Sequence, residues 1–324
     1  MPARIGVFVP QGWRMDLVAI DDPIEQYEWM TRFGVEAERL GYDSIWIYDH
    51  FHNVPKPELE TNFECWISTA ALARDTSTIR IGQMVTCNNY RQPSLLAKMA
   101  STVDVLSHGR LDFGIGAGWY KEEFEAYGYP FLDGPERLKM LEEALQIIKA
   151  MWTEPYATFE GKYYQVRGAI NEPKGVQKPH PPIWVGGSGE KVTLKLVAKY
   201  GDACNISIGP NPDDYHQKYE ALKQHCDNLG RDYDSIIKSA HVFMTLLEPG
   251  QDPVKATEYW RNLRNRTMEE YRKQTFVGTP QETIGWLNDL VAAGTDYIIL
   301  YFYNDLTKLD TLQLFAQEVL PAFR

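Results

Sequence analysis

Residues 107–119 read SHGRLDFGIGAGW. The polar turn Ser107–Arg110 leads into a short apolar strand, Leu111–Ile115, which runs directly into Gly116-Ala117-Gly118 and Trp119. Glycines at the carboxyl end of a strand let the backbone approach a bulky group closely, and tryptophan offers a flat apolar wall. Because ligands of α/β proteins bind at this edge, we expect Gly118 and Trp119 to lie in a ligand site. A tight strand-to-helix turn with a core tryptophan is the alternative.

Strand-like runs alternate with helical segments on both sides of this stretch. The clearest helix is 136–152, in which leucines, an isoleucine and a tryptophan form one apolar stripe. Eight strands, each followed by a helix, favour an α/β fold of the TIM (β/α)8 barrel type over an open doubly wound sheet. The strands are expected at 5–9, 44–48, 79–85, 111–115, 183–185, 203–206, 236–246 and 296–303.

The chain has no internal repeat and no linker that would divide it, so residues 1–324 are expected to form one domain. Two segments, 153–182 and about 247–275, depart from the alternating rhythm and are interpreted as insertions. The first contains a small hairpin over 159–166, and the second a charged helix over 253–272.

Composition excludes several classes of partner. The net charge of −11, with no run of Lys or Arg, argues against nucleic acid and anionic membranes and favours a small-molecule substrate. No apolar stretch reaches 18 residues, and the start, MPARIGVFVP, does not resemble a signal peptide. The four cysteines form no CxxC pair, so we expect reduced thiols in a cytoplasmic protein.

Candidate acid–base groups follow two of the strands. Histidine is a common acid–base residue, and Asp49 next to His50 can hold or tune it; a backbone-bonded loop histidine is the alternative. Glu123 falls four residues after Trp119 on an incipient helix, so both can face one side, with Glu122 toward solvent. No histidine has a partner at metal-ligand spacing and no Gly-x-Ser-x-Gly is present, so we expect neither a metal nor nucleophilic hydrolysis.

The fifth strand ends in Gly186-Gly187-Ser188-Gly189, ahead of a helix. Small residues in this position expose backbone N–H groups, and Ser188 adds a hydroxyl, so a phosphate would suit the loop; a plain glycine turn is the alternative. Several aromatic residues also crowd strands or their ends, which fits a flat ring ligand: Trp46, Tyr90, Trp119, Trp184 and Tyr303.

Taken in order, five segments of the chain resemble the bacterial luciferase-like superfamily, specifically its coenzyme F420-dependent oxidoreductase branch. These segments are 41–50, 79–128, 137–152, 181–205 and 277–302. The resemblance implies a luciferase-like TIM barrel that holds F420, or FMN in sister branches, at the carboxyl face of the strands. A homodimer is common in this superfamily, and the sequence leaves the oligomeric state open.

The resemblance also implies roles for individual residues. Met84-Val85 match a non-proline cis peptide and bulge that press on one face of the ring, and Asp49-His50 match the pair next to its reactive carbon. His50 would give or take the proton and Asp49 would orient it. The phosphate loop is matched by Gly187 and Ser188, and the ring's polar edge and side chain would pass Thr86 and Tyr90.

One position departs from the sugar-phosphate dehydrogenases of this family, which carry Glu immediately after the Gly-x-Gly of strand four. Trp119 stands there in this chain, and the nearest carboxylates are Glu122 and Glu123, so a sugar-phosphate substrate is not indicated. Glu123 is the candidate stand-in. Three functions follow: an F420-dependent hydride-transferring oxidoreductase, an FMN-dependent monooxygenase using reduced flavin and O2, and a barrel that binds a flavin-like ligand without turnover.

Overall fold

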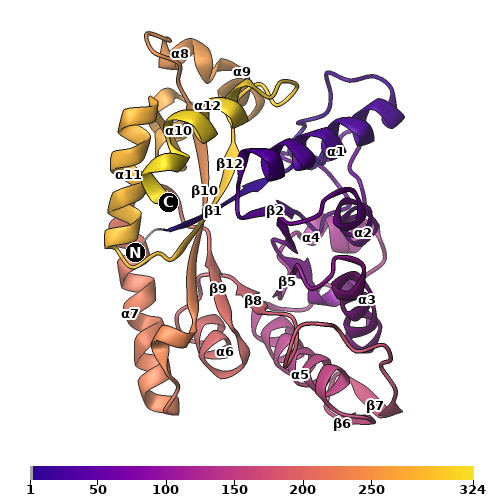
Figure 1. The fold of residues 1–324 in the computed structure, drawn as a ribbon. Coiled ribbons are helices and arrows are strands. Elements are labelled where there is room, and N and C mark those ends of the chain that lie inside the picture. Colours follow the sequence, from indigo (N-terminus) through magenta and orange to yellow (C-terminus); the bar gives the residue numbers. More distant parts are fainter. Residues whose placement is uncertain (1–2) are drawn as a thin grey trace.

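Eight parallel strands form a closed ring in the computed structural model, which describes residues 3–324 (Figure 1). Each strand pairs with the next along the chain, and the last pairs with the first, so the expected TIM barrel is confirmed. The ring consists of β1 (Arg4–Phe8), β2 (Ser44–Ile47), β3 (Arg80–Gln83), β5 (Leu111–Gly116), β8 (Ile183–Gly186), β9 (Ala203–Ile206), β10 (Ile237–Leu246) and β12 (Tyr297–Phe302).

Helices cover the outside of the ring. The eight longer ones are α1 (Pro23–Leu40), α2 (Cys65–Asp75), α3 (Pro93–Leu106), α5 (Gly134–Thr153), α6 (Thr193–Tyr200), α7 (Pro212–Leu229), α11 (Pro280–Ala292) and α12 (Asp310–Glu318). Five of the eight, α1, α2, α5, α7 and α11, begin at a side-chain cap, as at Asp133, which accepts the Glu136 N–H before α5. The longer helices bury apolar residues against the strands. Short 3₁₀ turns are η1 (Asn88–Tyr90), η2 (Tyr233–Ser235) and η3 (Leu320–Phe323).

The third strand is interrupted where the sequence predicts one run over 79–85. β3 ends at Gln83, the Met84–Val85 peptide is cis, and β4 (Thr86–Cys87) resumes pairing with β5. Between these two pairings the chain takes one residue more than β5 does, which makes a bulge. The cis peptide and bulge expected at this position are therefore confirmed.

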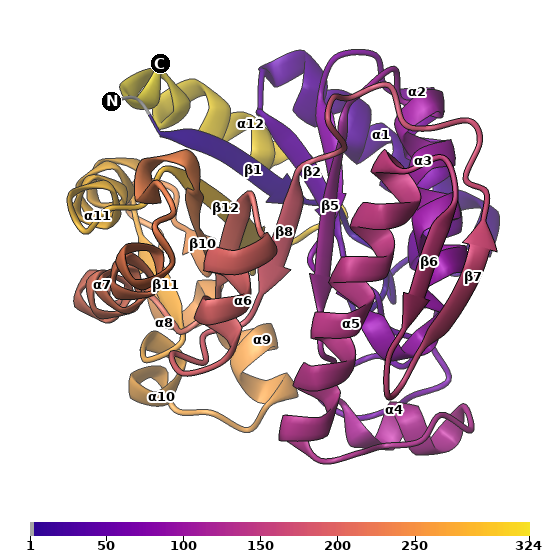
Figure 2. The same cartoon turned by 90° about the horizontal axis from the view of Figure 1, so that it is seen from below.

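The first irregular segment, 153–182, contains the hairpin β6 (Ala157–Glu160) and β7 (Gln165–Ala169), which lies along α5 on the outside of the barrel (Figure 2). The hairpin expected over 159–166 is confirmed, with strands that extend further at both ends.

The prediction of one helix over 253–272 is wrong. The segment forms three short helices, α8 (Pro253–Ala256), α9 (Glu258–Leu263) and α10 (Met268–Arg272). Asn265 has a φ of 49°, which ends helical geometry, and a capping box between Thr267 and Glu270 starts a new helix. β11 (Thr275–Gly278) follows and adds a parallel strand beside β10.

Large aromatic side chains fill the inside of the barrel. Trp46, Trp184 and Tyr297 pack edge to face, with centroids 4.9 and 5.2 Å apart, and the Trp46 Nε1–H and Tyr297 hydroxyl both donate to Ser44 Oγ at 2.6 Å. Trp46 and Trp184 are thus core residues, and the prediction that they face a ring ligand is wrong. Among the described residues, no helix is long and apolar enough to cross a membrane.

Candidate active site

A cavity of about 450 Å³ lies at the carboxyl ends of the strands. α4 (Lys121–Ala126) and the α8–α10 segment lie at the end of the barrel toward which the strands point (Figure 2). Of the residues expected in the site, Glu123 and Gly189 do not line the cavity. Those that line it are Asp49, His50, Met84, Val85, Thr86, Tyr90, Gly118, Trp119, Gly186, Gly187 and Ser188.

His50 is held on three sides at the cavity wall. Its ring stacks on Trp13, with centroids 4.2 Å apart and planes within 2°, and meets the edge of Trp119 at 5.8 Å. The Nδ1 atom lies 2.8 Å from Glu123 Oε2. Nε2 has no partner among residues 3–324, so this nitrogen is free for chemistry in the cavity.

Glu123, on α4, is fully buried behind His50 and collects four donors. Oε2 accepts from His50 and from the Tyr90 hydroxyl, and Oε1 accepts from the N–H groups of Phe51 and His52. Burial favours the neutral acid, but the hydrogen bonds from His50, Tyr90 and His52 outweigh it and hold the pKa of Glu123 below its ordinary value. Glu123 is therefore a carboxylate at neutral pH, and Nδ1 of His50 carries the proton between them.

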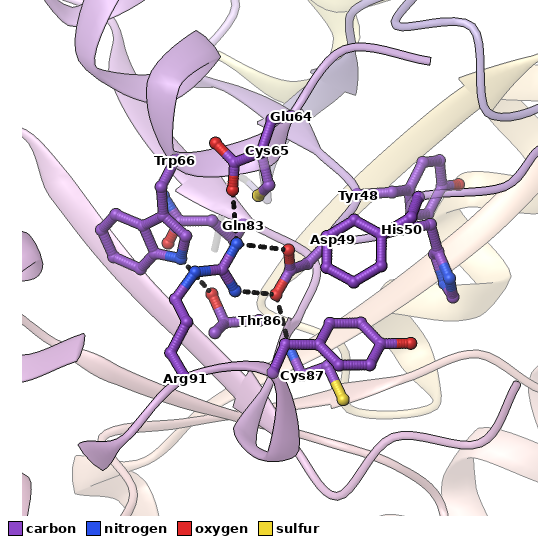
Figure 3. Close-up of polar contacts among 12 residues, drawn as sticks. Tyr48, Asp49, His50, Glu64, Cys65, Trp66, Gln83, Thr86, Cys87 and Arg91 are labelled. Atoms are coloured by element: carbon purple, nitrogen blue, oxygen red, sulfur yellow. Dashed lines mark hydrogen bonds and ion pairs between the residues drawn. The ribbon is translucent and has the colours of Figure 1, made fainter. Parts of the chain in front are cut away.

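Asp49 has a different set of contacts from the expected one. Its two oxygens accept from Arg91 Nη1 and Nη2 at 2.7 and 3.0 Å, and Oδ2 also accepts from the Cys87 N–H at 2.9 Å. Arg91 reaches Glu64 as well, and the His50 ring points away from this group (Figure 3). The expectation that Asp49 orients His50 is thus wrong. Glu123 binds the imidazole instead, and Asp49 connects the end of β2 to β4 through the Cys87 N–H.

Val85 projects between two glycines at the base of the cavity. A Cβ added to Gly116 would lie 2.7 Å from Val85 Cγ2, and one added to Gly186 would lie 2.8 Å from either methyl group. These glycines therefore admit a neighbouring valine side chain, whereas the sequence pattern predicts room for a ligand. Gly118 has a φ of 73°, and its Cβ would meet Cys87 and Phe124, so the turn before Trp119 requires glycine.

The loop after β8 presents unpaired donors. Gly187 has a φ of 128°, and its N–H donates to Asn205 O at 3.0 Å. In the part of the chain that the structure describes, the N–H groups of Ser188 and Gly189 and the Ser188 hydroxyl have no acceptor. This donor set fits a phosphate, as the loop sequence predicts.

The remaining expected residues differ in exposure. Trp119 is 60% exposed at the mouth of the cavity, so it is not a core tryptophan. Thr86 is fully buried, and its hydroxyl accepts from Trp66 Nε1 at 3.1 Å. Tyr90 lines the cavity and is anchored on Glu123, as described above.

Sequence reasoning missed several lining residues on or after strands one and seven. Trp13 and Arg14 follow β1, and His241 and Phe243 point inward from β10. Burial, with the nearby charge of Arg14, lowers the pKa of His241 to about 3, so it is a neutral acceptor or donor for the Tyr48 hydroxyl, 3.1 Å away. Applying the carboxyl-end rule to all eight strands would have found these positions.

No group of three or more His, Cys, Asp and Glu residues within 3–324 is arranged to hold a metal ion. The cavity chemistry available from the chain itself is thus acid–base chemistry at His50 and hydrogen bonding around the Gly187–Gly189 loop.

Comparisons with known proteins place this site in a family. Residues 3–297 match the family model described as luciferase-like monooxygenase. An F420-dependent glucose-6-phosphate dehydrogenase of Kineococcus radiotolerans is 30% identical over 239 residues, which cover 72% of this chain and 68% of that relative.

Solved structures agree on the fold. An F420-dependent secondary alcohol dehydrogenase in complex with an F420-acetone adduct superposes with a TM-score of 0.83 at 20% identity, over all of both chains. The monooxygenase RslO1 from Streptomyces bottropensis gives 0.81 at 20% identity, over 99% of this chain and all of that one. These relatives are enzymes, so the alternative of a barrel without turnover has no support. The resemblance to the luciferase-like superfamily and its F420-dependent branch is confirmed: the chain belongs to the luciferase-like monooxygenase family and is an oxidoreductase.

Proposed function

We propose that this protein is an F420-dependent oxidoreductase that transfers a hydride between the deazaflavin and a small organic substrate. The observation that carries the proposal is the His50–Glu123 pair, which leaves Nε2 of a positioned imidazole at the wall of a cavity large enough for a ring ligand. The 30% identical relative named as an F420-dependent dehydrogenase supports F420 as the coenzyme.

The residues present fit such a coenzyme. Val85 with Met84 would support the ring, and Thr86, Tyr90, Gly118 and Trp119 would surround it. The unpaired donors of the Gly187–Gly189 loop, together with Gly186 before it, would take the phosphate of its side chain. When bound, F420 supplies the hydride-accepting or hydride-donating carbon.

His50 acts as general acid–base in this proposal. Because ionised Glu123 holds the Nδ1 proton, Nε2 is the ring nitrogen that faces the cavity and can accept the proton of a substrate hydroxyl. In the reverse direction the protonated ring gives that proton to a carbonyl oxygen. Asp49 acts as a positioning residue, since it fixes the backbone of Cys87 beside the cavity.

The test is His50→Ala in the purified full chain. We expect the affinity for F420, measured by a fluorescence titration, to stay within a factor of about 2–3. Turnover, followed by the loss of F420 fluorescence with the best alcohol of a panel, should fall on the order of 10²–10⁴-fold. His216→Ala, on the exposed face of α7, is the matched control. Unchanged turnover in His50→Ala would remove His50 from the mechanism.

An FMN-dependent monooxygenase is the second candidate, favoured by the structural likeness to a monooxygenase. The same fluorescence titration with FMN separates the two. If FMN binds tightly and F420 does not bind, FMN replaces F420 as the proposed coenzyme. The role of His50 would then still be tested by His50→Ala.

A further inference from the structure

A second cavity of about 260 Å³ adjoins the first and is rich in arginine. The two cavities share Trp13, Arg14, Trp119 and Phe243, so the second lies directly beside the first. We call the second cavity the arginine pocket. It is lined by Trp13, Arg14, Val54, Pro55, Trp119, Phe243, Arg264, Arg266, Gln274, Thr275 and Tyr303.

Three guanidinium groups and no carboxylate line the arginine pocket, among the residues that the structure describes. This is unusual in a chain whose net charge is −11. Glu270 lies on the neighbouring surface beside Arg264 and Arg266, but its Oε2 is occupied by the N–H and hydroxyl of Thr267 at 2.8 and 3.0 Å.

Arg264 lacks hydrogen-bond acceptors altogether. Its Nη1 and Nη2 atoms are both buried and have no partner within the described range. The guanidinium lies 5.2 Å from the centre of the Tyr303 ring, and burial and the nearby charge of Arg14 lower the pKa of Arg264. A buried cation without an acceptor is costly, so a site of this kind is completed by an external anion.

Arg14 faces the same pocket with a donor set that is only partly used. Its guanidinium lies between Trp13 and Phe243, 4.4 and 4.3 Å from the ring centres, and Nη1 donates to the Tyr303 hydroxyl at 2.6 Å. Nε is buried without a partner. The aromatic rings hold the cation in place, but they cannot replace an oxygen acceptor.

We propose that the arginine pocket binds an oxyanion group of the substrate, a carboxylate or a phosphate, through Arg14, Arg264 and Arg266. The reaction that this substrate would undergo rests on the proposed function. The anion site itself is inferred only from the contacts of the three arginines. It places the charged end of the substrate past Trp119, and the reacting end beside His50. It thus predicts substrates that carry one anionic group at a distance from the carbon that is oxidised or reduced.

The experiment titrates the purified full chain with inorganic phosphate and, separately, with acetate, with and without saturating F420. Tryptophan fluorescence reports binding, because Trp13 and Trp119 both line the pocket. We expect saturable binding of at least one anion, and a dissociation constant raised about tenfold or more in Arg264→Met, since a hydrogen bond to a charged group is lost. The two arms distinguish a carboxylate from a phosphate ligand.

Arg272→Met is the matched control, because Arg272 is exposed, belongs to the same segment and does not line the pocket. It should leave the dissociation constant within about twofold. Without anion, Arg264→Met should melt at the same temperature as the unmodified protein or higher, which separates loss of binding from loss of fold.

Two results would overturn the proposal: no binding of either anion, or equal binding by Arg264→Met and the unmodified protein. The F420 titration is independent of both. If the anion binds at Arg264 and F420 does not bind, the proposed coenzyme is refuted and the proposed anion site stands. If F420 binds and neither anion does, the anion site is refuted and the proposed coenzyme stands.

Discussion

Replacing Glu123 by Gln should move a proton on His50. The glutamine keeps one oxygen, and the N–H groups of Phe51 and His52 are fixed in the backbone, so that oxygen stays with them. The new NH2 group then faces His50 Nδ1 and the Tyr90 hydroxyl, which both donate to Oε2 in the unmodified protein. Only a change of tautomer avoids two opposed donors, so Nδ1 becomes an acceptor and the proton moves to Nε2.

The magnitude follows from the same contacts. The two hydrogen bonds to Oε2, about 1.5–3 kcal/mol each with a charged acceptor, are replaced by two neutral ones of about 1 kcal/mol each, a net loss of about 1–4 kcal/mol. For 324 residues the unfolding entropy is about 0.7 kcal/mol/K, so the melting temperature should fall by about 1–6 °C. Because Nε2 is then blocked by a proton, turnover should fall on the order of 10²–10⁴-fold.

Long-range ¹H–¹⁵N correlation spectra of histidine-labelled protein report the tautomer directly, with His50→Ala used to assign the signals. Glu122→Gln is the control, since Glu122 is the exposed neighbour on the same helical turn and should change neither the tautomer nor the melting temperature. An Nδ1–H tautomer that persists in Glu123→Gln would refute the reasoning.

Three further predictions concern stability. Gly186→Ala places a methyl group 2.8 Å from Val85 and should lower the free energy of unfolding, measured in urea, by about 1–3 kcal/mol. Gly285→Ala, in open space on α11, is the control and should raise it by about 0.5–1 kcal/mol. Equal effects of the two substitutions would contradict the packing argument. Arg91→Met leaves the Asp49 carboxylate buried without its cation and should lower the free energy of unfolding by about 3–5 kcal/mol. The double variant with Asp49→Asn should recover much of this stability, whereas strictly additive losses would show that the two side chains are not coupled. His241 has a folded pKa of about 3 against about 6.5 unfolded, so unfolding takes up a proton below pH 6.5 and stability falls with pH at about 1.4 kcal/mol per unit. From pH 7 to 5, therefore, the free energy of unfolding of the unmodified protein should fall by about 2 kcal/mol more than that of His241→Phe. Equal losses in the two proteins would show that folded His241 can take up a proton in this range.

Local patterns along the chain were sufficient for the barrel and for part of the site. Each buried parallel strand is a short apolar run, and residues that directly follow such a run, such as His50 and Ser188, reach the cavity wherever the barrel closes. The 253–272 segment was mispredicted because its charges suit one long helix as well as three short ones, and the backbone breaks at Thr257 and Asn265 leave no mark in the pattern. The aromatic content could not separate Trp46, inside the barrel, from Trp119, at the mouth.

Contacts between distant segments were beyond local patterns. The partner of His50 is Glu123 on another helix, and the neighbour Asp49 instead meets Arg91, because consecutive residues leaving a strand point to opposite sides. The arginine pocket joins the loop after β1 to the loop after α9, so no spacing along the chain reveals it. The cytoplasmic location, the single domain and the homodimer remain predictions.

The fit of Val85 between Gly116 and Gly186 makes three positions on three separate segments interdependent during divergence. A relative that acquires alanine at either glycine position must first shorten the side chain at the position of Val85, and the order of these changes matters because the reverse order passes through a clash. Covariation of these three positions, rather than invariance of any one of them, is the signature to seek in an alignment of this family.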